Sequence, residues 1–159
     1  MCRRAPTRAQ DMRRSYPFTL AVAVAILLAP PAFAFDLSSL LANHEKDNFK
    51  LIHVSDLERL MAAKDAQVYV YDADPPDYRH REGVIPGAKL LPSSDRYDVA
   101  AELPADKSAK LVFYCYNLRC MASHAAARRA AKAGYTDVSV MVDGIDGWKK
   151  AGMSAAMLK

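Results

Sequence analysis

The sequence predicts one α/β domain with a mainly parallel β-sheet and helices on both faces of that sheet. Short β-branched and aromatic runs alternate along the chain with helix-like segments, an order that produces parallel β–α–β units. A length of 159 residues suits one domain, and 52% hydrophobic residues suffice for one core. The sequence contains no internal repeat and no glycine-rich phosphate loop, which excludes repeat architectures and P-loop nucleotide binding.

The first 34 residues are typical of a secretory signal peptide, and we expect their removal from the mature protein. Residues 18–29 form an apolar run that is too short for a comfortable transmembrane helix, and Ala32-Phe33-Ala34 then supplies an A-x-A cleavage signal. The basic residues ahead of this run are Arg3, Arg4, Arg8, Arg13 and Arg14. An uncleaved anchor is the alternative, and Met12 competes with Met1 as the start. We expect a periplasmic or secreted protein without stable membrane insertion after cleavage.

The charge of the mature chain argues against a polyanionic partner. Residues 1–34 hold five of the 22 basic residues and one of the 18 acidic residues, so cleavage leaves 17 of each. No basic patch interleaved with aromatic residues is present, and we expect no nucleic-acid partner. Cys115 and Cys120 are the cysteines of the mature chain. In an oxidising compartment such a pair is a disulfide, a redox couple, or a nucleophile with a neighbouring thiol.

The domain itself is expected at residues 50–155, after a lead-in segment at residues 35–49. Residues 50–54 predict a short first strand. Ser55 then has the features of a helix N-cap, with Glu58 at the capping-box position.

The first helix is predicted to end near residues 64–65. Residues 67–71 (QVYVY) are β-branched and aromatic, which predicts the next strand. Two prolines within residues 74–77 predict a turn, and the polar residues 78–82 that follow are compatible with a helix. A further short strand is expected at residues 89–91.

The second half of the chain continues the alternation. A short helix is predicted at residues 97–103 and a buried strand at residues 111–114. A long alanine-rich helix then runs toward Gly134, a suitable C-cap. The last strand is expected at residues 138–142, and residues 144–147 are interpreted as a turn.

The stretch around the two cysteines is the candidate site. Cys115 directly follows the strand at residues 111–114, and Cys120 closes the short loop before the alanine-rich helix. The carboxyl ends of parallel strands are where α/β proteins commonly bind ligands. A helix N-terminus favours an anion, and a thiolate is an anion. The pattern therefore predicts a reactive thiol at this loop.

Several separate stretches together resemble one family, the rhodanese-like sulfurtransferases. They span residues 51–152, and their order and spacing carry the resemblance. Val84 stands where the family usually has His, and Asp143 replaces the first Gly of its closing motif. The stretches are Val70-Tyr71-Asp72-Ala73, Gly83-Val84-Ile85-Pro86-Gly87-Ala88, Phe113-Tyr114-Cys115, and Gly144-Ile145-x-x-Trp148-x-x-Ala151-Gly152.

This resemblance implies a five-stranded parallel sheet and a catalytic cysteine, Cys115, that carries a persulfide. A donor such as thiosulfate would supply a sulfane sulfur, and an acceptor such as cyanide or a thiol, including a protein thiol, would take it. No cofactor is implied. The loop whose backbone N–H groups would stabilise the anionic sulfur consists of Tyr116, Asn117, Leu118, Arg119 and Cys120.

The loop departs from the common family pattern. It reads C-Y-N-L-R-C-M-A-S, about two residues longer than usual, and resembles a subset with C-x-x-x-x-C-x-x-S. Arg119 is the one arginine left in the loop for an anionic donor. Met121 stands where related phosphatases need Arg, which disfavours phosphate esters. A thiol–disulfide redox protein that cycles Cys115 with Cys120, or a non-catalytic module in which the pair is only a disulfide, are the alternatives.

The remaining polar candidates are interpreted as structural. Asp72 and Arg79 are expected to brace the sheet edge near the loop. His124, one turn into the long helix, is left outside the site. No metal is predicted, because the histidines lack ligand-like spacing with the cysteines. These histidines are His44, His53, His80 and His124.

Overall fold

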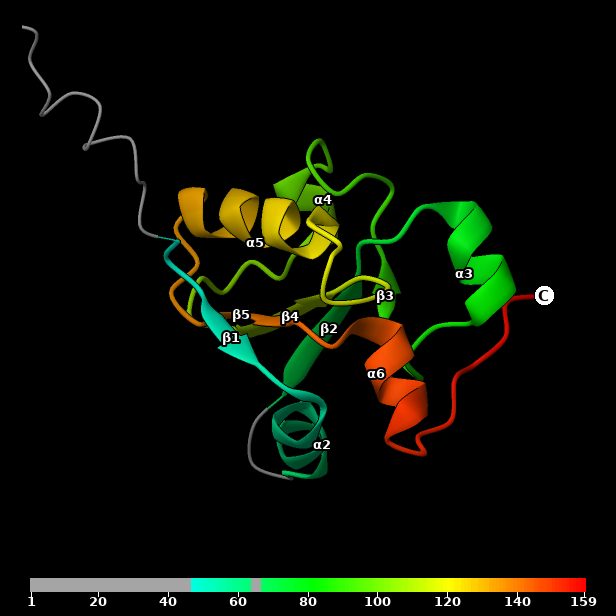
Figure 1. Cartoon of the computed structure of the whole chain (residues 1–159). Coiled ribbons are helices and arrows are strands. Elements are labelled where there is room, and N and C mark those ends of the chain that lie inside the picture. Colours follow the sequence, from blue (N-terminus) through cyan, green and yellow to red (C-terminus); the bar gives the residue numbers. More distant parts are fainter. Residues whose placement is uncertain (1–46, 64–66) are drawn as a thin grey trace, which may run out of the picture. The chain divides into compact units, whose positions relative to one another are not determined.

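A five-stranded parallel sheet forms the centre of the computed structural model, which describes residues 47–63 and 67–159 (Figure 1). The strand order is β1-β5-β4-β2-β3, and every neighbouring pair is parallel. The strands are β1 (Lys50–Ile52), β2 (Val68–Asp72), β3 (Lys89–Leu90), β4 (Lys110–Tyr114) and β5 (Val138–Met141). The predicted class, an α/β fold around a parallel sheet, is confirmed.

Helices cover both faces of the sheet. In Figure 1, α4 and α5 lie above it, while α2 and α6 lie below. The helices are α2 (Val54–Ala62), α3 (Pro76–Glu82), α4 (Val99–Glu102), α5 (Ala122–Lys132) and α6 (Gly144–Lys150). No helix in the described part of the chain has the length and apolarity needed to cross a membrane. The predicted signal peptide and most of the lead-in segment lie outside the described residues.

The central strand β4 separates two hydrophobic cores. Leu111 and Phe113 face the core that contains the alanines of α5, while Val112 and Tyr114 face the core under α2 and α6. All four side chains are fully buried. This alternation follows from the pleat of a strand whose two faces are both covered, and it explains the continuous apolar run in the sequence.

Helix α2 begins two residues earlier than the sequence predicted. His53 is the N-cap, and the predicted cap Ser55 lies inside the first turn. Asp56, rather than Glu58, completes the capping box, because its carboxylate accepts the His53 backbone N–H at 3.0 Å. Asp143 supplies the tertiary reason, since its carboxylate accepts the first backbone N–H of the helix at 2.9 Å.

The segment at residues 144–147 is the first turn of helix α6, so its interpretation as a turn was wrong. The backbone N–H of Ile145 donates to the Cys115 carbonyl at 2.9 Å, and that of Asp146 donates to the Tyr116 carbonyl at 3.0 Å. These long-range bonds satisfy N–H groups that a helix start leaves free. Helix α3 likewise begins at Pro76, inside the predicted turn, because proline suits the first helical position.

Asp72 and Arg79 form the buried brace that the sequence predicted. The Arg79 Nε donates to the Asp72 carboxylate at 2.9 Å, and a second guanidinium nitrogen donates to the backbone carbonyls of Asp72 and Leu91 at 2.8 Å. The arginine thereby links the end of β2, helix α3 and the residue after β3. Since both partners are buried, the pair positions the strand ends beside the candidate site.

Candidate functional site

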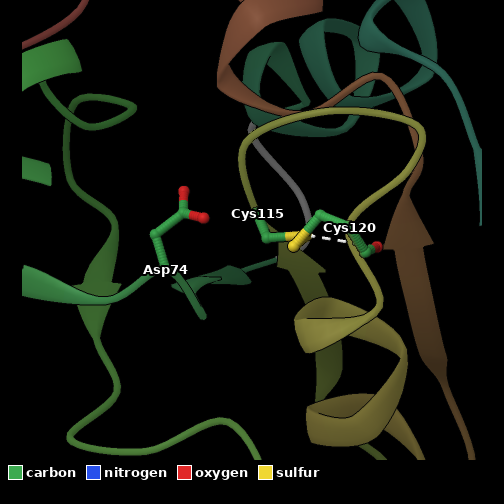
Figure 2. Close-up of side chains that lie close together, drawn as sticks. All are labelled: Asp74, Cys115 and Cys120. Atoms are coloured by element: carbon green, nitrogen blue, oxygen red, sulfur yellow. Dashed lines mark hydrogen bonds between the residues drawn. A yellow bond between two sulfur atoms is a disulfide. The ribbon is translucent and has the colours of Figure 1, made fainter. Parts of the chain in front are cut away.

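The two cysteines meet in a disulfide at the carboxyl end of β4 (Figure 2). Cys115 directly follows the strand and is 2% exposed, and Cys120 directly precedes Met121, the N-cap of α5. Their Cα atoms are 6.3 Å apart, within the range that disulfides span. The sequence left open whether these thiols pair, and the structure contains their oxidised form.

The loop between the cysteines is held by Asn117. Its side-chain oxygen accepts the Arg119 backbone N–H at 3.0 Å, and its carbonyl accepts the Cys120 backbone N–H at 3.0 Å. Its amide group donates to the Asp146 carboxylate of α6 at 3.4 Å. Two of the backbone N–H groups that were predicted to stabilise the anionic sulfur therefore donate hydrogen bonds within the loop. Asn117 fixes the turn that brings the sulfurs together.

The other predicted loop residues occupy different surroundings. Tyr116 is half-buried, with its ring centroid 4.8 Å from that of Tyr78. Leu118 and Arg119 are exposed, and Leu118 is 69% accessible to solvent. They border a surface depression of about 370 Å³ that also contains Lys150 of α6. Arg119 thus lies on the outer side of the loop rather than in the buried sulfur environment.

Gly144 allows α6 to approach this loop closely. It has φ of +67°, and a Cβ added there would lie 2.5 Å from the Cys115 carbonyl oxygen and the Asn117 nitrogen. Such contacts cannot be accommodated without moving the backbone. The glycine of the closing sequence motif therefore fixes the distance between the loop and α6.

Ser123 is a site residue that the candidate set missed. It lies in the first turn of α5, is 2% exposed, and places its hydroxyl oxygen 3.3 Å from the Cys115 sulfur. In the disulfide the hydroxyl is the donor, because the sulfur carries no proton. The same sulfur lies 3.4 Å from the Cys120 carbonyl oxygen, a contact that can become a hydrogen bond only after reduction. The C-x-x-x-x-C-x-x-S pattern already contained the signal.

Asp74 is the second site residue that the sequence analysis missed, because the two prolines that follow it indicated only a turn. It is 3% exposed, and a carboxylate oxygen lies within 4.8 Å of both disulfide sulfurs (Figure 2). Burial raises the pKa of Asp74 to about 7, and the nearby Asp72 charge acts in the same direction. A carboxyl group of this kind exchanges protons near neutral pH.

Asp74 and the two cysteines also form a compact group of atoms of the kind that bind metals. In the disulfide the sulfurs offer no thiolate, the form in which cysteine binds a metal. His124 contributes nothing to this group. Its ring packs edge-on against Phe49 at 5.7 Å, and burial lowers the pKa of His124. These contacts agree with its interpretation as a structural histidine.

The sequence model of the rhodanese-like domain family matches residues 53–151. The chain belongs to the rhodanese-like domain family. The resemblance inferred from the separate motifs is thus confirmed, together with the five-stranded parallel sheet that it implied. Among curated proteins, none matches the chain.

Solved structures share this rhodanese-like fold at low sequence identity. The BH2092 protein from Bacillus halodurans has a TM-score of 0.59 at 18% identity, covering 76% of this chain and 85% of that one. A homodimeric polysulfide-sulfur transferase from Wolinella succinogenes has a TM-score of 0.58 at 17% identity, covering 77% and 88%. A thiosulfate sulfurtransferase from Pseudomonas aeruginosa has a TM-score of 0.57 at 22% identity, covering 70% of this chain and 21% of its own. Sulfurtransferases therefore occur among the structures with this fold.

Proposed function

We propose that the protein is a sulfurtransferase that carries a sulfane sulfur on Cys115. The observation that supports this most directly is the surroundings of the Cys115 sulfur. It lies at the carboxyl end of the central strand, ahead of helix α5 and 3.3 Å from the Ser123 hydroxyl. After reduction, the helix N-terminus and the hydroxyl donor both favour a thiolate, which is the nucleophilic form of cysteine.

The reaction begins with reduction of the Cys115–Cys120 disulfide by an external dithiol, which becomes a disulfide itself. The Cys115 thiolate then attacks the outer sulfur of a donor such as thiosulfate. A new S–S bond forms, the S–S bond of thiosulfate breaks, and sulfite leaves with the electron pair. The resulting persulfide passes its terminal sulfur to a thiolate or cyanide, and Cys115 returns as a thiolate.

The surface next to the loop carries charges of both signs. The depression bordered by Arg119 and Lys150 places two cations on the outer side of the disulfide loop. Asp143 and Asp146 line the same depression, so its field is mixed rather than uniformly positive. A donor of low charge, or a thiol on a protein partner, therefore fits it better than a strongly charged anion does.

The proposed compartment follows from the sequence. Residues 1–34 have the features of a secretory signal peptide, so we place the mature protein in the periplasm or outside the cell. A cysteine pair that forms a disulfide suits an oxidising space. Its partners there would be small sulfur compounds and thiols, and no cofactor is required.

A thiol–disulfide redox protein is the second candidate, and the disulfide itself is the observation that favours it. The two functions require different cysteines. Sulfur transfer needs Cys115 and tolerates loss of Cys120, whereas a redox cycle needs both sulfurs.

The test measures thiocyanate formation from thiosulfate and cyanide by reduced protein. Cys115→Ser should abolish the activity, and Cys120→Ser, a matched change five residues away, should retain it. If Cys115→Ser keeps full activity, the proposal is wrong. If neither the reduced wild type nor Cys120→Ser transfers sulfur, but both cysteines are needed to oxidise a substrate dithiol, the protein is a thiol–disulfide redox protein instead.

A further inference from the structure

Asp74 lies at the disulfide, next to the loop that joins the two cysteines. One of its carboxylate oxygens is within 4.8 Å of both sulfurs, and Figure 2 shows its side chain beside the Cys115–Cys120 bond. Its Oδ1 atom is buried and has no hydrogen-bond partner. Unpartnered buried oxygens of this kind are uncommon, and a catalytic or redox role is one of their recognised explanations.

The nearest cation does not neutralise this carboxyl group. The Arg79 guanidinium is directed to the Asp72 carboxylate and to two backbone carbonyls. Asp74 is therefore buried next to an ion pair whose hydrogen bonds it does not share, and the Arg79 charge lowers the pKa of Asp74 by less than burial raises it. Under these conditions burial disfavours the charged form, and the pKa of Asp74 rises to about 7. The side chain can hold a proton at neutral pH and can also release it.

We propose that Asp74 is the proton donor and acceptor for the Cys115 sulfur when the Cys115–Cys120 disulfide opens and closes. A separation of up to 4.8 Å suits transfer through one water molecule. The inference rests on the proposed function in one respect, because Cys115 must become a free thiol before it can attack a sulfur donor. It assigns the proton transfer that this activation requires.

The opening step can be written in full. One thiolate of an external dithiol attacks the sulfur of Cys120, a residue that is 7% exposed, against 2% for Cys115. A mixed disulfide forms, the Cys115–Cys120 bond breaks, and the electron pair leaves on the Cys115 sulfur. Asp74 protonates that sulfur. The second thiol of the reductant loses its proton to solvent and, as a thiolate, attacks the mixed disulfide. Cys120 leaves as a thiolate, and the reductant is oxidised by two electrons.

The reverse proton transfer prepares the nucleophile. Once Asp74 is a carboxylate, it accepts the Cys115 proton, and the Ser123 hydroxyl donates to the thiolate that remains. Several groups face Asp74 and set the pH at which this occurs. These groups are Asp72 on β2, Tyr78 and Arg79 on α3, Tyr114 on β4, Tyr116 in the loop, Asp146 on α6 and the two cysteines.

The test measures the rate of disulfide reduction by dithiothreitol from about pH 5 to about pH 9. Rates are divided by the thiolate concentration of the reductant. For the wild type this corrected rate should fall as the pH rises through about 7, because Asp74 loses its proton. Asp74→Asn should lack this inflection and react about 100-fold more slowly at low pH. Asp74→Glu should restore the inflection, and Asp77→Asn, an exposed carboxylate on α3, should behave like the wild type.

An Asp74→Asn profile that matches the wild type overturns the proposal. If that variant does not fold, the carboxyl carbon of Asp74 is titrated by NMR in the wild type. Its pKa should rise on reduction, since a thiolate nearby disfavours a second charge, and an unchanged pKa also overturns the proposal. Thiocyanate formation by pre-reduced wild-type protein is measured separately. If the wild type forms no thiocyanate but its reduction rate still shows the inflection near pH 7, the sulfurtransferase function is refuted and the proposed role of Asp74 is retained.

Discussion

Replacing Asp74 by Asn should make the protein more stable above neutral pH and change it far less in acid. The folded state holds this carboxyl group at a pKa of about 7, whereas the ordinary pKa of an aspartate side chain is 3.8. The folded state therefore binds the proton more tightly than the unfolded state. Stability falls as the pH rises from about 4 to about 7 and is then constant.

The magnitude follows from these two values. One pKa unit corresponds to about 1.4 kcal/mol, so the buried carboxylate costs the folded protein up to about 4 kcal/mol above pH 7. About 2–3 kcal/mol of that cost develops between about pH 5 and about pH 8. The isosteric amide does not ionise, so the advantage of Asp74→Asn over the wild type should grow by this amount across the same interval.

Urea unfolding of the oxidised proteins, followed by circular dichroism at both pH values, measures this difference. Other titrating groups cancel, because the wild type and the variant share them. Asp77→Asn removes an exposed carboxylate and should show no such growth. If the stability difference between Asp74→Asn and the wild type is the same at both pH values, the folded protein does not raise the pKa of the Asp74 carboxyl group.

Three further substitutions test the supports of the site. Gly144→Ala should destabilise the protein by about 2–4 kcal/mol by denaturant unfolding, and Gly152→Ala, which shares a positive φ but meets open space, should cost less; equal costs would contradict the close approach to the loop. Arg79→Met should lower the free energy of unfolding by about 3–5 kcal/mol, because it leaves the buried Asp72 carboxylate unpaired. An unchanged free energy of unfolding would show that this ion pair does not stabilise the fold. Ser123→Ala should slow alkylation of reduced Cys115 about tenfold near pH 7, since a donor to the thiolate is lost; an unchanged rate would exclude that donor.

The sequence predicted the elements that depend on local pattern. The apolar strand and alanine-rich helix around Cys115 have unambiguous periodicity, and both form near the expected residues. The N-cap at Ser55 failed because the cap at His53 depends on Asp143, which follows about 90 residues later. Residues 144–147 looked like a turn because two glycines and an aspartate favour one locally. Their helical form depends on loop carbonyls that the local sequence does not contain.

The candidate site was predictable where a motif marked it. Cys115 and its loop followed from the strand end and the family resemblance, but the state of the cysteine pair depends on the backbone path between them. The position of Asp74 beside Cys115 could not be predicted from the sequence. Its position follows from the register in which Asp72 pairs with Tyr114, so that the chain leaving β2 runs beside Cys115. Sheet register is a tertiary property, and a carboxylate beside two prolines looks solvated in the sequence alone.

The most direct test of the central claim is the mass of Cys115 after reduced protein has reacted with thiosulfate. Peptide mapping of the wild type should find one additional sulfur atom on Cys115 and none on Cys120. Addition of cyanide should remove that sulfur and yield thiocyanate, and Cys120→Ser should gain and lose it in the same way. A Cys115 that remains unmodified while thiosulfate is in excess would contradict the account.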